Sequence, residues 1–175
     1  MRPNHSRAAL LVIVAASVMN THPICAQRAA PPPLPVPQET AVTTIARGTF
    51  DVSVKPLPSD EFAEAAALGR MSIDKQFHGD LEGSSKGQML ATSTAVTGSA
   101  AYVAIEKVTG SLKGRRGSFS LQHSAWMAGG KQGMTITVVP DSGTEQLVGL
   151  SGTLLIIIAE GKHSYEFSYS LPGAN

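Results

Sequence analysis

The stretch YVAIEKVTGSLKGRRGSFSLQHSAWM, residues 102–127, reads as two long strands joined by a glycine-rich turn. Its second half alternates polar and apolar side chains, which is typical of a strand with one face toward a core. The apolar face carries Phe119 and Leu121, and it also carries His123. We therefore expect an antiparallel hairpin with a histidine on its inner face.

The pairing of the two strands determines whether Glu106 shares that inner face. We take residues 114–117, GRRG, as the loop. This places Glu106 opposite Ala125 and diagonally across from His123, and cross-strand partners share a face. Glu106 is therefore expected to point inward, whereas a loop one residue longer or shorter would turn it outward.

A carboxylate and an imidazole inside an apolar barrel are costly unless they hydrogen-bond each other or a bound group. Two roles stay open for this pair. In the first, Glu106 and His123 are a satisfied structural pair. In the second, desolvation raises the pKa of Glu106, which then acts as an acid/base catalyst oriented by His123 on a small apolar ligand.

Further short alternating runs lie between glycine-rich turns on both sides of the hairpin, and EFAEAAALG at 61–69 is a short helical pattern. About eight short strands in one small domain favour a closed barrel, because closure removes the strand edges. We therefore expect an all-β fold, a closed eight-stranded antiparallel β-barrel with a short helical or irregular segment near residues 60–70. The predicted strands are 50–54, 71–77, 89–96, 101–108, 118–127, 134–139, 153–159 and 163–171.

The last two predicted strands differ in how their faces are covered. In 163–171 aromatic and polar side chains alternate, whereas TLLIIIA at 153–159 is apolar on both faces. An apolar outward face is usually covered by another part of the protein. We expect either a homo-oligomer through the 154–158 strand or coverage by the segment 57–70.

The chain begins with the pattern of a secretory signal peptide, since a basic start precedes an apolar run shorter than a membrane span. We expect residues 1–26 to be this signal, cleaved after Ala26, which predicts a periplasmic or secreted protein. The alternatives are an uncleaved membrane anchor and a lipoprotein modified on Cys25. Residues 27–46 are expected to form a proline-rich linker, and residues 47–175 the β-barrel domain.

The charge of the chain argues against several function classes. Loss of residues 1–26 would remove two arginines and the single cysteine, leaving 12 basic and 13 acidic residues. Such a balance speaks against binding of nucleic acid or an anionic membrane. The histidines that remain, His78, His123 and His163, are not at metal-ligand spacing, so we expect no metal and no cofactor.

Two glycine-rich stretches contain basic residues, GSSKG at 83–87 and GSLKGRRG at 110–117. Both lie between predicted strands rather than before a helix. We therefore do not interpret either of them as a phosphate-binding loop.

Several longer phrases together resemble the bacterial family known as domain of unknown function 3224, from about Gly48 to Leu171. The resemblance implies the barrel of allene oxide cyclases, with eight antiparallel strands and a central cavity. It implies no activity, and no motif maps the cavity glutamate of plant allene oxide cyclases onto Glu106. The phrases are SIDKQFHGDLEGSSKGQML, GSAAYVAIEKVTG, GRRGSFSLQHS, ITVVPDSGTEQLVGLSG and GKHSYEFSYSL.

Three functions stay open on this basis. The first is an exported barrel that binds a small apolar or amphipathic ligand in its lumen. The second is a cyclase or isomerase with Glu106 as acid/base and His123 as its orienting partner, and the third is a structural oligomeric module. The side chains expected to bind the ligand are Tyr102, Phe119, Leu121, Tyr165, Phe167 and Tyr169.

Overall fold

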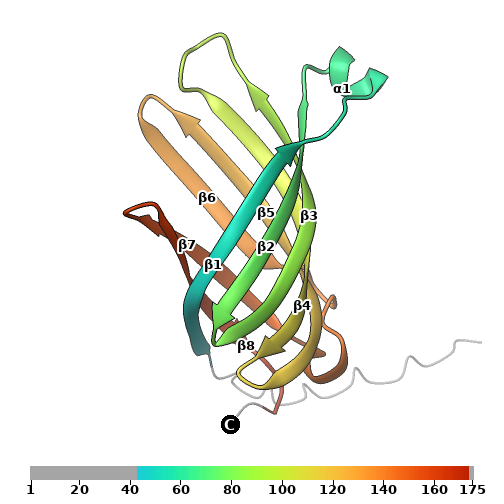
Figure 1. Cartoon of the computed structure of the whole chain (residues 1–175), viewed down its shortest axis with the longest axis vertical. Helices are drawn as coiled ribbons and strands as arrows, with labels where there is room; N and C mark the ends of the chain where they lie inside the picture. Colours follow the sequence, from blue (N-terminus) through green and yellow to red (C-terminus); the bar gives the residue numbers. More distant parts are fainter. Residues whose placement is uncertain (1–42, 174–175) are drawn as a thin grey trace, which may run out of the picture. The chain divides into compact units, whose positions relative to one another are not determined.

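The computed structural model describes residues 43–173, in which each strand pairs with the next and the last pairs with the first (Figure 1). All of these pairings are antiparallel. The expected closed eight-stranded antiparallel β-barrel is thereby confirmed. The elements are β1 (Thr44–Pro56), α1 (Glu61–Ala65), β2 (Gly69–Gly79), β3 (Leu81–Ser93), β4 (Ala100–Leu112), β5 (Arg115–Ala128), β6 (Lys131–Val138), η1 (Glu145–Leu147), β7 (Ser151–Ala159) and β8 (Lys162–Ser170).

The predicted signal peptide and residues 27–42 of the predicted linker lie outside the described residues. β1 begins at Thr44, ahead of the domain boundary expected at residue 47. Between residues 43 and 173, no helix is long and apolar enough to cross a membrane.

The β4–β5 hairpin turns at Lys113–Gly114 rather than at residues 114–117. Both turn residues have positive φ, 45° and 83°, as a type I′ turn requires. Glu106 consequently faces Leu121 instead of Ala125. The predicted register was wrong by four residues. Because side chains alternate with a period of two, this even error leaves the inner and outer faces as predicted.

Residues 83–87, GSSKG, form part of β3 and do not lie between strands. Glycine and serine are poor strand formers, but here β3 pairs with β2 on one side and with β4 on the other. The small inward residues also leave space for a neighbour, since a Cβ atom on Gly87 would lie 2.6 Å from the Cβ of Glu106. Residues 110–117 likewise form the end of β4, the turn and the start of β5.

Buried apolar side chains fill the half of the barrel nearer the C-terminus, the lower half in Figure 1. The rings of Phe119 and Phe167 stack with centroids 5.8 Å apart, and Tyr169 contacts Phe167 at 5.3 Å. η1 and the residues after it close this end of the barrel, where Leu147 and Leu150 are buried. The lower lumen is therefore core.

Toward the opposite, upper end, the inward side chains become progressively more exposed. The inward side chains at this end are still apolar, but they are partly open to solvent. Their exposed fractions are 44% for Val54, 47% for Met127, 44% for Met134 and 64% for Ile158. The upper end of the barrel is thus open to solvent and carries apolar inward side chains.

The barrel is also uneven around its circumference. β6 and β7 pair at one position, Thr137 with Thr153, whereas β7 and β8 pair along the whole of residues 151–159. Above that position β6 and β7 diverge (Figure 1).

The short helix expected near residues 60–70 is present as α1, at the upper end of the barrel (Figure 1). The carboxylate of Asp60 accepts a hydrogen bond from the N–H of Ala63 and so caps the helix. Arg70 extends from β2 to the carboxylate of Asp60 and to Gln88 of β3. These hydrogen bonds connect the segment to β2 and β3, whereas the outward face of β7 is exposed, so the expected coverage of the strand 153–159 by residues 57–70 was wrong.

Candidate functional site

Polar side chains from four consecutive strands meet inside the barrel, at the upper boundary of the packed core. Lys75 comes from β2, Ser85 from β3, Glu106 from β4 and His123 from β5. Each is at most 5% exposed. We call these four residues the lumen cluster.

The carboxylate of Glu106 is the centre of the lumen cluster. Its Oε1 accepts a hydrogen bond from Nζ of Lys75 at 2.7 Å and lies 2.9 Å from Nε2 of His123. Its Oε2 accepts a hydrogen bond from Oγ of Ser85 at 2.6 Å. Because an ionised carboxylate only accepts hydrogen bonds, Nε2 of His123 carries the proton in this arrangement.

Aromatic rings surround the ammonium group of Lys75. Its Nζ lies 5.2 Å from the ring centre of Phe50 and 5.8 Å from that of Phe77. Both distances are within the range of a cation–π interaction. The charge of Lys75 is therefore balanced by one carboxylate and two ring faces rather than by water.

The ionisation of Glu106 reflects these neighbours. Burial alone raises the pKa of Glu106, but the hydrogen bond from His123, the charge and hydrogen bond of Lys75 and the hydrogen bond from Ser85 together lower it from 4.5 to about 2. The raised pKa expected from desolvation was therefore wrong. The hydrogen bond from His123 lowers the pKa most, and Lys75 and Ser85, which the sequence analysis did not include in the site, lower it further.

The inward position of Glu106 and His123 is confirmed, but two of their partners were missed. A signal for Lys75 exists in the sequence, because it alternates with Ile73 and Phe77 and so shares their inward face. Ser85 lies in the glycine-rich stretch that was not recognised as a strand.

Most of the predicted ligand-binding side chains lie below the lumen cluster. They are buried and belong to the apolar core: Phe119, Leu121, Tyr165, Phe167 and Tyr169. Tyr102 alone among the predicted six lies toward the open end, where its hydroxyl contacts Sδ of Met134 at 3.4 Å. Burial and the charge of Glu106 both raise the pKa of Tyr102.

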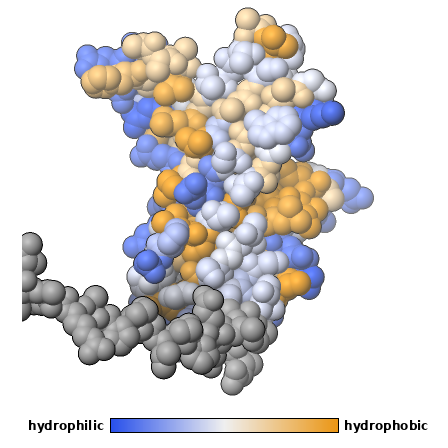
Figure 2. Space-filling view, turned by 180° about the vertical axis from the view of Figure 1, so that it is seen from behind, coloured by the Kyte–Doolittle hydropathy of each residue, from blue (hydrophilic) through white to orange (hydrophobic). Residues whose placement is uncertain are grey.

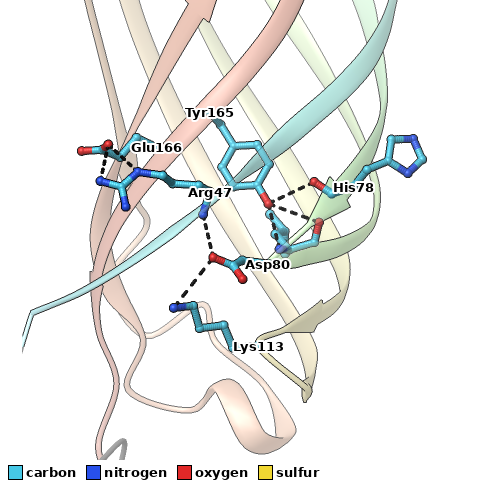
Figure 3. Close-up of polar contacts among 7 residues, drawn as sticks. Arg47, His78, Asp80, Lys113, Tyr165 and Glu166 are labelled. Atoms are coloured by element: carbon cyan, nitrogen blue, oxygen red, sulfur yellow. Dashed lines mark hydrogen bonds and ion pairs between the residues drawn. The ribbon is translucent and has the colours of Figure 1, made fainter.

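Tyr165 has a clear structural role near the lower end of the barrel (Figure 3). Its hydroxyl accepts a hydrogen bond from the N–H of Leu81 at 2.8 Å and lies 3.3 Å from the carbonyl oxygen of His78. This ties β8 to the β2–β3 turn. In the same region Arg47 pairs with Glu166 at 2.8 Å.

The described residues contain no group of three histidine, cysteine or acidic side chains positioned to hold a metal ion. The lumen cluster offers one carboxylate, one ammonium group, one imidazole and one hydroxyl.

The fold and the lumen cluster define a class of protein: a closed antiparallel barrel with a packed lower half, an open apolar upper end and an ion pair between them. The family described as protein of unknown function (DUF3224) matches residues 46–169. The chain belongs to this family, as the resemblance seen in the sequence implied.

A solved structure supports the assignment. The crystal structure of a protein with unknown function from the DUF3224 family of Shewanella oneidensis MR-1 is similar to this chain, with a TM-score of 0.70 and 47% sequence identity. The similarity covers 76% of this chain and 100% of that one. No curated protein matches the chain.

Proposed function

We propose that the barrel binds one small amphipathic molecule in the upper half of its lumen, above the lumen cluster. The lower end is closed by η1 and the core, so a molecule can enter from the upper end. There it meets partly exposed apolar side chains first and the polar groups of the lumen cluster beneath them. Ligand sites commonly combine apolar walls with a small number of polar groups in this way.

The observation that carries this proposal is spare hydrogen-bonding capacity inside an apolar lumen. Within residues 43–173, Nζ of Lys75 has one hydrogen-bond acceptor, although an ammonium group has three N–H donors. Nδ1 of His123 makes no hydrogen bond in the same part of the chain, and because no buried side-chain nitrogen there lacks a partner, Nδ1 is accessible to solvent. Both groups can therefore bond to a ligand without giving up Glu106.

The charge of the lumen cluster indicates the chemistry of the ligand. Lys75 and Glu106 offset each other, so a ligand that brought a further charge would bury it without a counter-charge. A neutral hydroxyl or carbonyl group avoids that cost. We therefore propose an apolar molecule with a neutral polar end.

Acid–base catalysis by Glu106 is not part of the proposal. A carboxylate with a pKa of about 2 is a weak base, and it holds no proton to donate near neutral pH. The cyclase or isomerase expected as an alternative therefore has no support from the ionisation of Glu106.

The proposal includes export, because residues 1–26 have the pattern of a signal peptide. Intact mass spectrometry of the protein from a periplasmic fraction tests it, and the expected mass corresponds to a chain that begins at Gln27. A full-length chain found only in the cytoplasm would contradict export.

The binding proposal is tested with a matched pair of substitutions on β5. Ala125 points into the upper lumen, two residues beyond His123, and its neighbour Ser124 points outward and is exposed. Ala125→Phe fills the proposed site, whereas Ser124→Phe adds the same ring outside it. The probe is the neutral fluorophore N-phenyl-1-naphthylamine, followed by fluorescence and displaced with 1-decanol.

We expect Ala125→Phe to weaken probe binding by about tenfold or more, a loss of about 1.4 kcal/mol, while Ser124→Phe binds as the unmodified protein does. No saturable binding to the unmodified protein, or equal binding by both variants, would overturn the lumen site. Native mass spectrometry of the gently purified protein provides a second test, because a stoichiometric bound molecule is expected to be lost in Ala125→Phe.

A further inference from the structure

One strand edge of the barrel is left free. β7 pairs with β8 along residues 151–159 but with β6 only at Thr153. The main-chain N–H and C=O groups of residues 154–159 that point away from β8 thus have no strand partner within the described part of the chain. Such a row of groups is a template for pairing with another strand.

The free part of β7 is strongly apolar. Leu155 is 55% exposed, Ile157 44% and Ile158 64%. In Figure 2, which views the molecule from behind, an apolar patch lies at mid-height on the right, the side on which the β7–β8 hairpin projects. Residues 153–159 contain no charge and no proline, the features that usually protect an edge strand from pairing.

The edge of β6 across the same gap is different. It carries three exposed polar side chains, Lys131, Gln132 and Thr135, beside one exposed apolar side chain, Met134. A polar edge with a lysine has the usual protection, so the unprotected edge is confined to β7. An asymmetry of this kind is expected if only β7 is covered in the working protein.

We propose that a second copy of the chain covers this edge, with its own β7 antiparallel to the first. A two-fold contact brings a segment against itself, so the segment must match its own reverse. With Ile156 on the two-fold axis, Leu155 lies opposite Ile157 of the second copy, and Leu154 lies opposite its Ile158. Aliphatic side chains therefore meet at every position from 154 to 158.

The charges near the edge are compatible with this pairing. Glu160 is the first charged residue after the apolar stretch, and in the same register it lies opposite Gly152 of the second copy. No like charges face each other across the two-fold axis. Pairing with an unrelated strand would not require residues 154–158 to be aliphatic at both members of each symmetry-related pair. Pairing with a second copy does require this, so a second copy fits the sequence better. The dimer is independent of ligand binding in the lumen.

Sedimentation velocity of the purified protein over a range of concentrations tests the proposal. Ile157→Lys places a charge at the centre of the proposed contact. The matched control is Ile105→Lys, because Ile105 is 52% exposed on β4, a strand that is paired on both sides. The unmodified protein and Ile105→Lys are expected to sediment as dimers, and Ile157→Lys as a monomer.

Three results would overturn the dimer: an unmodified protein that is monomeric at about 100 μM, a concentration at which specific interfaces form; an Ile157→Lys variant that stays dimeric; or dissociation of both lysine variants. Hydrogen exchange adds a second readout, since the amides of residues 154–159 are expected to become protected as concentration rises.

Discussion

Nζ of Lys75 lies 2.7 Å from Oε1 of Glu106, and neither side chain is more than 5% exposed. Burying two charges costs several kcal/mol for each ion, and their attraction recovers this only with good geometry and further hydrogen bonds. Here Ser85, His123 and two aromatic rings supply those bonds and contacts. The pair therefore links β2 to β4 at little net gain in stability, and the loss of one partner is much more costly than the loss of both.

This asymmetry gives the first prediction. Glu106→Gln leaves the charge of Lys75 buried without a counter-charge, and Lys75→Met does the same to Glu106. Each single variant is expected to lose about 3–5 kcal/mol of the free energy of unfolding, and the double variant less than the two losses added together. Urea denaturation of all three checks this, and strictly additive losses would count against an ion pair.

The second prediction concerns acid stability. The pKa of Glu106 is about 2 in the folded protein and about 4.5 when the chain is unfolded, so the unfolded chain binds more protons between these values. The stability that Glu106 contributes is complete above pH 4.5 and is lost as the pH falls toward 2. Urea denaturation at pH 7, 5, 4 and 3 is expected to show this loss. The double variant Lys75→Met/Glu106→Gln is the control, and its stability is expected to depend less on pH; identical profiles would contradict the lowered pKa.

The faces of the β4–β5 hairpin could be predicted from the sequence, but its turn could not. Alternation alone places Glu106 and His123 on the inner face, and that result survives a register error of an even number of residues. The common signal for a type I′ turn is Asn-Gly, whereas this turn is Lys113–Gly114 with a lysine at positive φ. The glycines at 114 and 117 were the clearer turn signal, and they led to the wrong prediction of a loop at residues 114–117.

The position of each inward side chain along the barrel axis could not be predicted from the sequence either. Alternation identifies Tyr165 and Phe167 as inward residues, but it does not say whether an inward residue lies in the packed half or in the open half. That depends on how the strands are staggered around the barrel, which is set by pairings between distant segments such as β1 and β8. The contact of Lys75 with Glu106 was missed for the same reason, since it joins residues of two strands that are not neighbours in the sheet.

The third prediction tests the structural role of Tyr165. Tyr165→Phe removes the hydroxyl that accepts the hydrogen bond from Leu81 and leaves that buried N–H without its partner. A loss of about 1–3 kcal/mol in the free energy of unfolding is expected. Tyr169→Phe is the matched control, because among the described residues the hydroxyl of Tyr169 makes no hydrogen bond. Equal losses in the two variants would show that the hydrogen bond of Tyr165 has no special weight.

The last prediction concerns the space that Gly87 leaves for Glu106. A Cβ atom at Gly87 would lie 2.6 Å from the Cβ of Glu106 and would also collide with the carbonyl oxygen of Ile105. At Gly69, in contrast, a Cβ atom would meet only the carbonyl oxygen of Ala91, at 3.7 Å. Neither glycine has a positive φ, so the two differ mainly in available space.

Alanine normally favours a strand over glycine by about 0.5–1 kcal/mol, so Gly69→Ala is expected to be neutral or slightly stabilising.

Gly87→Ala must push β4 away from β3 at the level of Glu106, and a loss of stability is expected, measured by urea denaturation. Because Ser85 and Lys75 reach Glu106 across this contact, the lowered pKa is expected to rise as well. The free energy of unfolding of Gly87→Ala should then depend less on pH between 5 and 3 than that of the unmodified protein. A general loss of packing would not produce this effect. A variant as stable as Gly69→Ala, with the pH profile of the unmodified protein, would mean that the close approach of β3 and β4 is not needed to hold the carboxylate in place.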